Sequence, residues 1–205
     1  MKKSARLFVF TMLFAAVSAH AADAPAAKAD DKAAADKAAM MEKMKVIMSP
    51  GEAHKALEPL AGKWTYTSKM WMAPGAPAEE TSGDAENTLI YGGRFLKQEV
   101  KGTWMNQPFE GVGYTGYDNI RAQYESVWLD SMATSMMSTS GQFDSFKKVL
   151  TQSGANSCPV TGEKDRKGHS EWTVIDNDHN TYSLYMAGPD GKEVKMMEIT
   201  YVRAV

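Results

Sequence analysis

The feature that most constrains the fold is a series of short alternating segments that fills the chain after Gly62. The segments are rich in Thr, Val, Tyr and Trp, and their apolar and polar residues alternate with the period of a β-strand. Turn sequences such as Asn106-Gln107 and Asp118-Asn119 separate them. We expect strands near residues 63–72, 84–91, 93–104, 108–117, 121–131, 134–143, 146–154, 164–175, 180–187 and 193–203.

The short connections between these segments determine the topology. Parallel strands need long crossovers, so strands joined by tight turns must run antiparallel to their neighbours. A meander of about ten strands tends to close on itself, because closure removes both free edges. The sequence therefore predicts an all-β fold, a closed antiparallel up-and-down β-barrel with a short N-terminal helix.

A helix is expected just before the first strand. Ser49 is predicted as its N-cap, Pro50 as the first helical residue, and Glu52 completes a capping-box pattern. The helix is expected to run through Leu60 and to end at Gly62, which permits a sharp turn. This helix would plug one end of the barrel.

The stretch LAGKWTY (60–66) then begins the first strand. Trp64 is expected to lay its ring across the barrel floor and to seal that end. By the period of two, Tyr66 and Met70 share its face.

The N-terminus has the three parts of a secretory signal peptide. Lys2, Lys3 and Arg6 are followed by an apolar run over residues 7–17 and by Ala19-His20-Ala21, the small-residue pattern of a cleavage site. The apolar run is too short to span a bilayer, so we expect no stable membrane insertion after cleavage. We predict a signal peptide over residues 1–21, and a periplasmic or secreted bacterial protein.

Residues 22–48 are expected to form a leader separate from the barrel domain, residues 49–205. The sequence ADAPAAKADDKAAADKAA (22–39) has no aromatic and no β-branched residue, so it cannot form a core. We expect a flexible and partly helical leader. Its last part, from Met40 to Met48, carries Met and Ile residues at helical spacing.

The net charge and the cysteine content argue against nucleic-acid binding and against an intrachain disulfide. Removing residues 1–21 takes 3 of the 23 basic residues and none of the 25 acidic ones, which leaves a net charge of −5. A mildly acidic chain without a basic patch is not expected to bind nucleic acid. Cys158 is the only cysteine, so no intrachain disulfide can form. It is either a reactive or bridging thiol or a partly buried small residue, and the sequence leaves its role open.

A helix followed by Gly-x-Trp and a ten-strand meander resembles the calycins, the group of lipocalins, fatty-acid-binding proteins and nitrobindin-like barrels. Six stretches of the chain carry a more specific resemblance: KMWMAPGAP (69–77), GGRFLKQ (92–98), QPFEGVGYTGYDN (107–119), WLDSM (128–132), PVTG (159–162) and GPDGKEVKMMEITYVR (188–203). Through them, residues 51–203 are similar to the bacterial family called domain of unknown function 1579. That resemblance implies a lipocalin-like barrel and no established activity, ligand or catalytic residue, and the leader lies outside it.

One predicted strand offers the best candidate for a ligand pocket. Tyr124, Ser126, Trp128 and Asp130 share a face, and Met132 continues it. An aromatic wall that ends in a carboxylate provides apolar area for affinity and a polar group for orientation. The alternative is that Trp128 packs in the core and Asp130 caps a turn.

Interior polar groups could orient such a ligand. If Leu96, Gln98 and Val100 face inward, Gln98 and Arg94 are interior and could meet Asp130 or a ligand head group. Arg94 follows the turn at Gly92-Gly93, however, and an exposed position on the barrel rim fits it equally well.

Glu198 is a further candidate, because a carboxylate among apolar neighbours usually has a partner. Arg94 or Arg121 could be that partner. Glu198 shares its predicted face with Val194, Met196, Thr200 and Val202.

Other functions remain as alternatives. Met accounts for 15 of the 205 residues, with clusters at Met70–Met72, Met136-Met137 and Met196-Met197, and thioethers suit Cu(I). Nitrobindin-like barrels hold haem through a histidine, for which His54, His169 and His179 are the candidates. Asp130, Glu110 and Glu198 could provide the carboxylates of a periplasmic hydrolase or isomerase, although no catalytic motif is present. The leader could instead contact a partner.

The hypothesis favoured by the sequence is noncovalent binding of a small, partly apolar molecule inside the barrel. We predict no cofactor, no metal site and no catalytic residue. The candidate ligand-binding residues are Trp64, Trp71, Arg94, Gln98, Trp128, Asp130, Met132 and Glu198.

Overall fold

The computed structural model of the chain describes residues 24–73, 75–157, 162–188 and 191–205. The predicted signal peptide and Cys158 therefore lie outside the described residues, as does part of the expected turn at Pro189-Asp190-Gly191. Two compact units are formed, one ending at Met44 and the other comprising Lys45–Val205.

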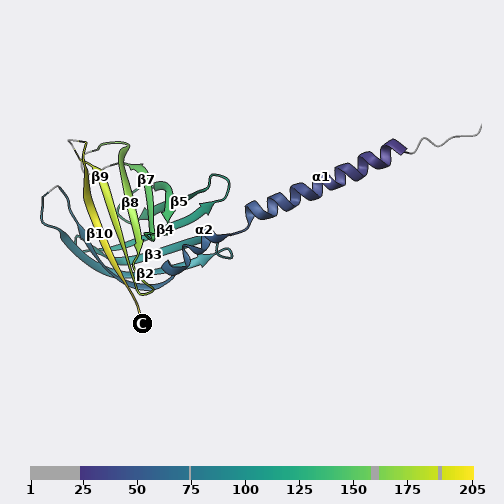
Figure 1. Ribbon diagram of the computed structural model, residues 1–205. Coiled ribbons are helices and arrows are strands. Elements are labelled where there is room, and N and C mark those ends of the chain that lie inside the picture. The colour runs from purple at the N-terminus through teal and green to yellow at the C-terminus, as the bar shows by residue number, and fades with distance from the viewer. Residues whose placement is uncertain (1–23, 74, 158–161, 189–190) are drawn as a thin grey trace, which may run out of the picture. The chain divides into compact units, whose positions relative to one another are not determined.

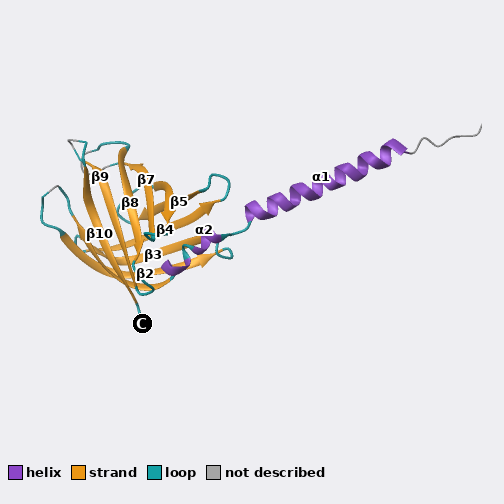
Figure 2. Cartoon of the chain, in the orientation of Figure 1, coloured by secondary structure: helices purple, strands orange, loops and turns teal. Residues whose placement is uncertain are grey.

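The second unit is a closed barrel of ten antiparallel strands, as the sequence predicted (Figure 1). Each strand pairs with its neighbours in the chain, and the first strand pairs with the last, so that Tyr66 lies opposite Tyr201. In Figure 2 the strands form the whole wall. The strands are β1 (Gly62–Met70), β2 (Glu79–Ile90), β3 (Phe95–Trp104), β4 (Gln107–Asp118), β5 (Gln123–Asp130), β6 (Met137–Asp144), β7 (Val149–Asn156), β8 (Arg166–Val174), β9 (His179–Ala187) and β10 (Glu193–Arg203).

The helix before the barrel is shorter than expected and starts later. It consists of α2 (Glu52–Lys55) and a 3₁₀ helix, η1 (Glu58–Leu60). Its N-cap is Gly51, whose N–H donates to His54 Nδ1 at 3.0 Å, so the prediction of a Ser49 cap was wrong. Pro59 lacks an N–H and cannot continue an α-helix, which fits its place in the first turn of the separate η1.

The carbonyl oxygen of Leu60 joins this plug to the barrel. It accepts hydrogen bonds from Trp64 Nε1 at 3.0 Å and from Asn87 Nδ2 at 2.8 Å. Trp64 is 1 % exposed, so its ring fills the floor as predicted. Gly62 takes a φ of 128°, which side chains rarely adopt, and this conformation permits the sharp turn from η1 into β1.

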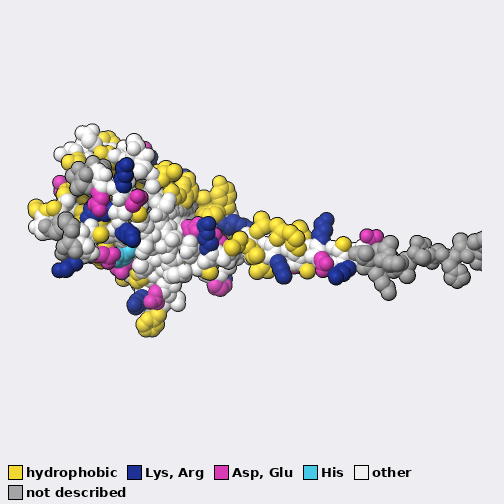
Figure 3. Space-filling view, turned by 90° about the horizontal axis from the view of Figure 1, so that it is seen from above, with side chains coloured by type: hydrophobic (Ala, Val, Ile, Leu, Met, Phe, Trp, Pro, Cys, Tyr) yellow, Lys and Arg dark blue, Asp and Glu magenta, His cyan; other side chains and the backbone are white. Residues whose placement is uncertain are grey.

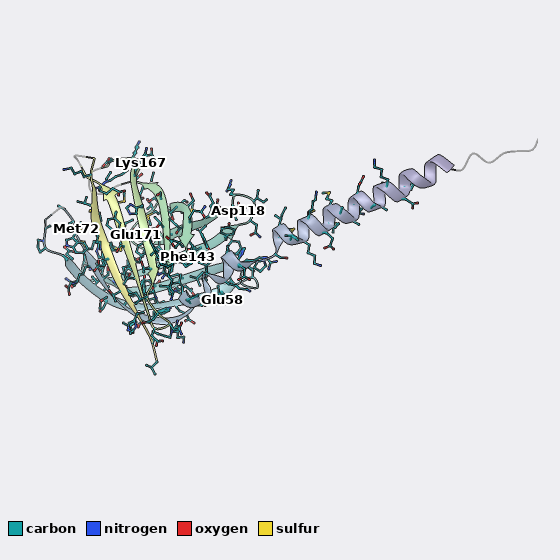
Figure 4. The ribbon with its side chains drawn as sticks, viewed as in Figure 1. Glu58, Met72, Asp118, Phe143, Lys167 and Glu171 are labelled. Carbon is teal, nitrogen blue, oxygen red and sulfur yellow. The ribbon has the colours of Figure 1, made fainter. Side chains whose placement is uncertain are left out.

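The core inside the barrel lies next to the plug. Leu57 and Leu60 pack against inward side chains from four strands, Leu96, Tyr124, Leu150 and Trp172. In Figure 4, Glu58 and Asp118 mark this plug end, and Met72 and Lys167 lie at the opposite end of the barrel. That opposite end is the one with space for a ligand.

The leader forms a single helix, α1 (Ala24–Met48). From Asp30 to Met48 its side chains are exposed, including the apolar residues at its C-terminal end (Figure 3). Within the described residues, no helix has both the length and the apolar character needed to cross a membrane. The exposed apolar residues are Met40, Met41, Met44, Val46, Ile47 and Met48.

Candidate functional site

The barrel encloses a cavity of about 260 Å³. Its lining includes residues at the strand ends farthest from the plug, such as Met70 of β1, Trp104 of β3 and Asp130 of β5. Toward the plug the lining ends at Leu96 and Trp172, which belong to the core that contacts Leu57 and Leu60. The cavity therefore extends from the core to the open mouth of the barrel.

Pairing and burial define which faces line this cavity. Tyr66, Ser68 and Met70 of β1 line it, as do Gln98 and Val100 of β3. On β5 the inward face is the one that carries Ser126, Trp128 and Asp130. These are the faces that the sequence grouped together as candidate inner walls.

Glycines on the inner wall make room for the aromatic side chains. The Trp128 ring lies against Gly111 of β4, where an added Cβ would be 2.3 Å from Trp128 Cζ2. The Tyr66 ring lies in the same way against Gly83 and Gly102, and a Cβ at Gly102 would be 2.3 Å from the Tyr66 hydroxyl oxygen. Because the rings lie against the wall, the middle of the barrel stays open.

A chain of hydrogen-bonded side chains crosses one wall of the cavity. Thr115 Oγ1 and Ser126 Oγ are 2.8 Å apart, and Ser126 Oγ donates to Gln152 Oε1 at 2.8 Å. Gln152 is 5 % exposed, yet its Nε2 has no hydrogen-bond partner among the described residues. The amide is thus fixed through its oxygen, while its nitrogen is left without a partner.

The opposite wall is lined by buried tyrosines and Gln98. Burial raises the pKa values of Tyr66, Tyr182 and Tyr201, so all three hydroxyls stay protonated near neutral pH. The Gln98 amide lies beside the Tyr201 hydroxyl and slightly opposes this rise. Within the described part of the chain, Gln98 Nε2 forms no well-aligned hydrogen bond.

Asp130 holds Trp128 and the adjoining turn in place. Its Oδ2 accepts from Trp128 Nε1 at 2.9 Å, and its Oδ1 accepts from the backbone N–H groups of Met132 and Ala133 at 2.9 and 3.0 Å. Trp128 and Asp130 thus line the cavity, and Asp130 also caps a turn. Among the residues that the structure describes, Asp130 is the only Asp, Glu, Lys or Arg in the lining.

Four of the eight predicted ligand-binding residues line the cavity, namely Gln98, Trp128, Asp130 and Met132. Trp64 lies outside the lining and serves as the buried floor. Trp71 follows β1 and is half-buried, with its backbone N–H donating to Met196 O at 2.9 Å. Neither tryptophan is in the lining.

Arg94 lies at the plug end rather than in the cavity. It belongs to the turn between β2 and β3, and its Nε and Nη2 donate to Met48 O at 3.1 and 2.8 Å. Its Nη1 donates to Tyr91 O at 2.8 Å. The expected strand 93–104 starts only at Phe95, and for this reason Arg94 does not share the inward face of Gln98.

Glu198 points away from the cavity. On β10, Met197 and Ile199 line the cavity, so the alternate position 198 faces outward. Its carboxylate pairs with Lys195 Nζ at 2.5 Å, and the suggested pairing with Arg94 or Arg121 was wrong. A bulge between Lys195 and Met197 breaks the alternation that the sequence suggested.

The enzyme, haem and Cu(I) hypotheses depend on which side chains line the cavity. Glu110 pairs with Lys101 on the outer surface at 3.7 Å, so Asp130, Glu110 and Glu198 do not converge. No histidine belongs to the lining, and in the described part of the chain no cluster of three or more His, Cys, Asp and Glu residues could hold a metal ion. Four methionines do line the cavity: Met70, Met132, Met137 and Met197.

Several lining residues were missed by the sequence reasoning. Trp104 continues the inward period of Gln98 and Val100 to the end of β3, and its Nε1 also lacks a partner within the described residues. Gln152 and Ser170 lie on strands whose inward face had not been assigned. The alternation from Gln98 could have identified Trp104, whereas the other two needed the register of β7 and β8.

Comparison with known proteins agrees with this architecture. The family model described as "Protein of unknown function (DUF1579)" matches residues 49–203. The chain belongs to this family. The matched region begins after α1, so the leader lies outside it.

Solved structures support the same fold. Rv2717c from M. tuberculosis is similar at a TM-score of 0.56 with 18% identity, over 77% of this chain and 100% of that one. A redesigned β-barrel is similar at a TM-score of 0.38 with 14% identity, over 76% and 100% of the two chains, too distant for any argument. No curated protein matches the chain significantly.

Proposed function

We propose that the barrel binds a small, partly apolar molecule noncovalently in its cavity. The observation that carries this proposal is the cavity of about 260 Å³, which has an apolar wall and polar groups at fixed places. A barrel interior filled by side chains would have no such space. Ligand pockets commonly combine a mostly apolar wall with a few placed polar groups.

The size of the cavity limits the ligand. A cavity of roughly 150 Å³ is enough to hold benzene. At about 260 Å³ this cavity suits a ligand somewhat larger than a single aromatic ring. The open mouth allows part of a longer molecule to extend outside.

We further propose that the protein is exported and acts in the periplasm or outside the cell. The support is the pattern of residues 1–21, where a basic start, an apolar run and a small-residue site follow one another. An exported protein of this kind could carry or sequester a small molecule.

Native mass spectrometry of the protein purified from its own host tests ligand binding. A co-purifying molecule in stoichiometric amount, released on denaturation, is the expected result. The matched control is Ser68→Phe, which places a ring in the cavity and should purify empty. Recovery of the same molecule with this variant would place the binding site elsewhere.

Cu(I) binding is the second candidate, because one cavity gathers Met70, Met132, Met137 and Met197. Met70 and Met197 are direct partners across β1 and β10. Thioethers are soft ligands that select Cu(I). Methionine also fills irregular apolar pockets, which makes the organic ligand the better-supported proposal.

A Cu(I) titration against a chromophoric chelator separates the two candidates. If copper is the ligand, Met70→Leu and Met197→Leu should each weaken Cu(I) binding, whereas Met72→Leu, outside the lining, should not. Equal and weak copper retention by all three variants and the parent would remove this candidate.

A further inference from the structure

We infer that the ligand is a neutral molecule with a hydrogen-bond-accepting oxygen, such as a ketone, ester or amide, rather than a carboxylate or phosphate. This inference rests on the proposed function and narrows it. It follows from two properties of the lining, which are unpartnered donors and the absence of cationic side chains.

The unpartnered donors are carried by three residues of the lining. Gln98 Nε2, Gln152 Nε2 and Trp104 Nε1 are each buried, and none has a hydrogen-bond partner among the described residues. Buried polar groups are nearly always paired, so unpaired donors on residues that line a cavity indicate a missing acceptor. An oxygen atom of a ligand is the simplest such acceptor.

The two amides reach the cavity from distant parts of the wall. Gln98 lies on β3 and Gln152 on β7, with three strands between them in the closed order. Gln152 is held through its Oε1 by Ser126, which fixes the direction of its N–H groups. Donors from two walls can bind one oxygen through both of its lone pairs or two oxygens of one ester.

Buried hydroxyls add donors of the same kind. Burial raises the pKa of Tyr201 and Tyr182, so their hydroxyls stay protonated. The Tyr201 hydroxyl lies beside the Gln98 amide, and both residues line the cavity. The polar groups therefore offer protons without offering positive charge.

Charge excludes anionic ligands. The part of the lining that the structure describes contains no Lys, Arg or His, and its one charged residue is Asp130. A buried carboxylate or phosphate needs a cation or several strong donors to offset its desolvation. Asp130 would in addition repel it.

Asp130 is a poor partner for a cationic ligand as well. Its two oxygens already accept hydrogen bonds from Trp128 Nε1 and from the backbone N–H groups of Met132 and Ala133. A neutral ligand avoids both problems.

The experiment compares probes of one shape and different head groups by intrinsic tryptophan fluorescence, since Trp104 and Trp128 line the cavity. The probes are heptyl methyl ketone, octanoate, heptylamine and nonane. We expect the ketone to bind at least about a hundredfold more tightly than octanoate, because the buried anion finds no cation.

Variants of the donors then test the assigned atoms. Gln98→Met and Gln152→Met keep the side-chain size and remove the N–H groups. Each should weaken ketone binding roughly three- to tenfold and leave nonane binding unchanged or tighter. Thr151→Leu, on the exposed face beside Gln152, is the matched control and should bind all probes as the parent does.

The outcomes separate this inference from the proposed function. Octanoate or heptylamine binding as tightly as the ketone overturns the inference and leaves the cavity a ligand site. Ketone binding that neither Gln98→Met nor Gln152→Met weakens also overturns the inference, because the ligand oxygen would then accept no hydrogen bond from either amide. Binding of none of the four probes overturns both. The comparison of ketone with octanoate uses the unmodified protein, so it holds even if a variant does not fold.

Discussion

The guanidinium of Arg203 lies over the indole ring of Trp64, with 4.1 Å between Arg203 Cζ and the ring centroid. Arg203 Nη1 donates to Ala61 O at 2.9 Å, and Nη2 donates to Pro59 O at 3.1 Å. One side chain of the last strand therefore holds both the first strand and the plug. Its contacts span more than 130 residues of sequence, so they form only when the barrel closes.

Replacing Arg203 by Met should lower the free energy of unfolding by about 2–4 kcal/mol, the sum of a cation–π contact and charge-assisted hydrogen bonds. Arg203→Lys should keep only part of this stabilisation, because the Lys ammonium lacks the planar set of N–H donors that a guanidinium has. Urea denaturation measures the effect. Arg121→Met, which removes an exposed ion pair with Glu125, is the control and should change stability little.

His54 should make the protein sensitive to mild acid. Burial, and to a smaller extent the charge of Arg94, lowers the pKa of His54, while a hydrogen bond to the Tyr117 backbone opposes the shift. In its neutral form His54 Nδ1 accepts from the Gly51 N–H, and protonation abolishes this cap of α2.

The sign follows from linkage. Because the pKa of folded His54 is lowered, its contribution is fully present above the unfolded pKa of roughly 6.5 and is lost as pH falls below that value. The denaturation midpoint should therefore decrease as the pH is lowered below about 6.5, and His54→Gln should reduce this dependence on pH. A His54→Gln variant with the same pH dependence as the parent would contradict this role.

Asp130→Ala should loosen the mouth of the cavity without unfolding the barrel. It removes three hydrogen bonds, one of them from the Trp128 indole, and should lower stability by about 1–3 kcal/mol. Fluorescence quenching by acrylamide measures the freedom of Trp128 and should increase. The control is Asp144→Ala. It removes a comparable turn cap, in which Asp144 Oδ1 accepts from the backbone N–H groups of Phe146 and Lys147, and it leaves Trp128 in place. Equal quenching in both variants would contradict the proposed role of Asp130.

Filling the cavity should weaken ligand binding strongly and lower the free energy of unfolding only moderately. Ser68 is 7 % exposed and lines the cavity, so Phe at this position occupies the space of the ligand. We expect binding of the best probe to weaken at least about tenfold because the ring excludes it, while overpacking should lower the free energy of unfolding by roughly 1–3 kcal/mol. Thr67→Phe puts the same ring on the exposed face of the same strand. If both variants bind the probe like the parent, the cavity is not the site.

The barrel could be predicted because its signals are local. Period-two alternation and turn residues identified all ten strands, and the Gly62-x-Trp64 motif located the plug. On β1, β3 and β5 the alternation also grouped the residues that share a face, but it left open which face points inward. The burial of Trp64, Leu96 and Tyr124, which are all at most 3 % exposed, identifies the inward one.

The candidate site was only partly predictable, because it depends on exact register. Of the two positions left open for Arg94, the structure shows the one at the rim, because β3 begins at Phe95, two residues later than the expected strand. Glu198 was misplaced because the bulge near Met196 interrupts the alternation along β10. The unpartnered amide of Gln152 depends on Ser126, which is 26 residues away in the chain, and no local pattern predicts such a contact.

Because the number of antiparallel strands is even, the chain enters and leaves the barrel at the same end. The chain enters the barrel at Gly62 and leaves it at Arg203, and both points adjoin the plug, where Ala204 N donates to Lys63 O at 2.8 Å. A fluorescent tag, a second domain or a solid support joined before Gly62 or after Arg203 is therefore attached at the sealed end. Sensors built from this barrel could be immobilised through either junction and keep their mouth accessible to the sample.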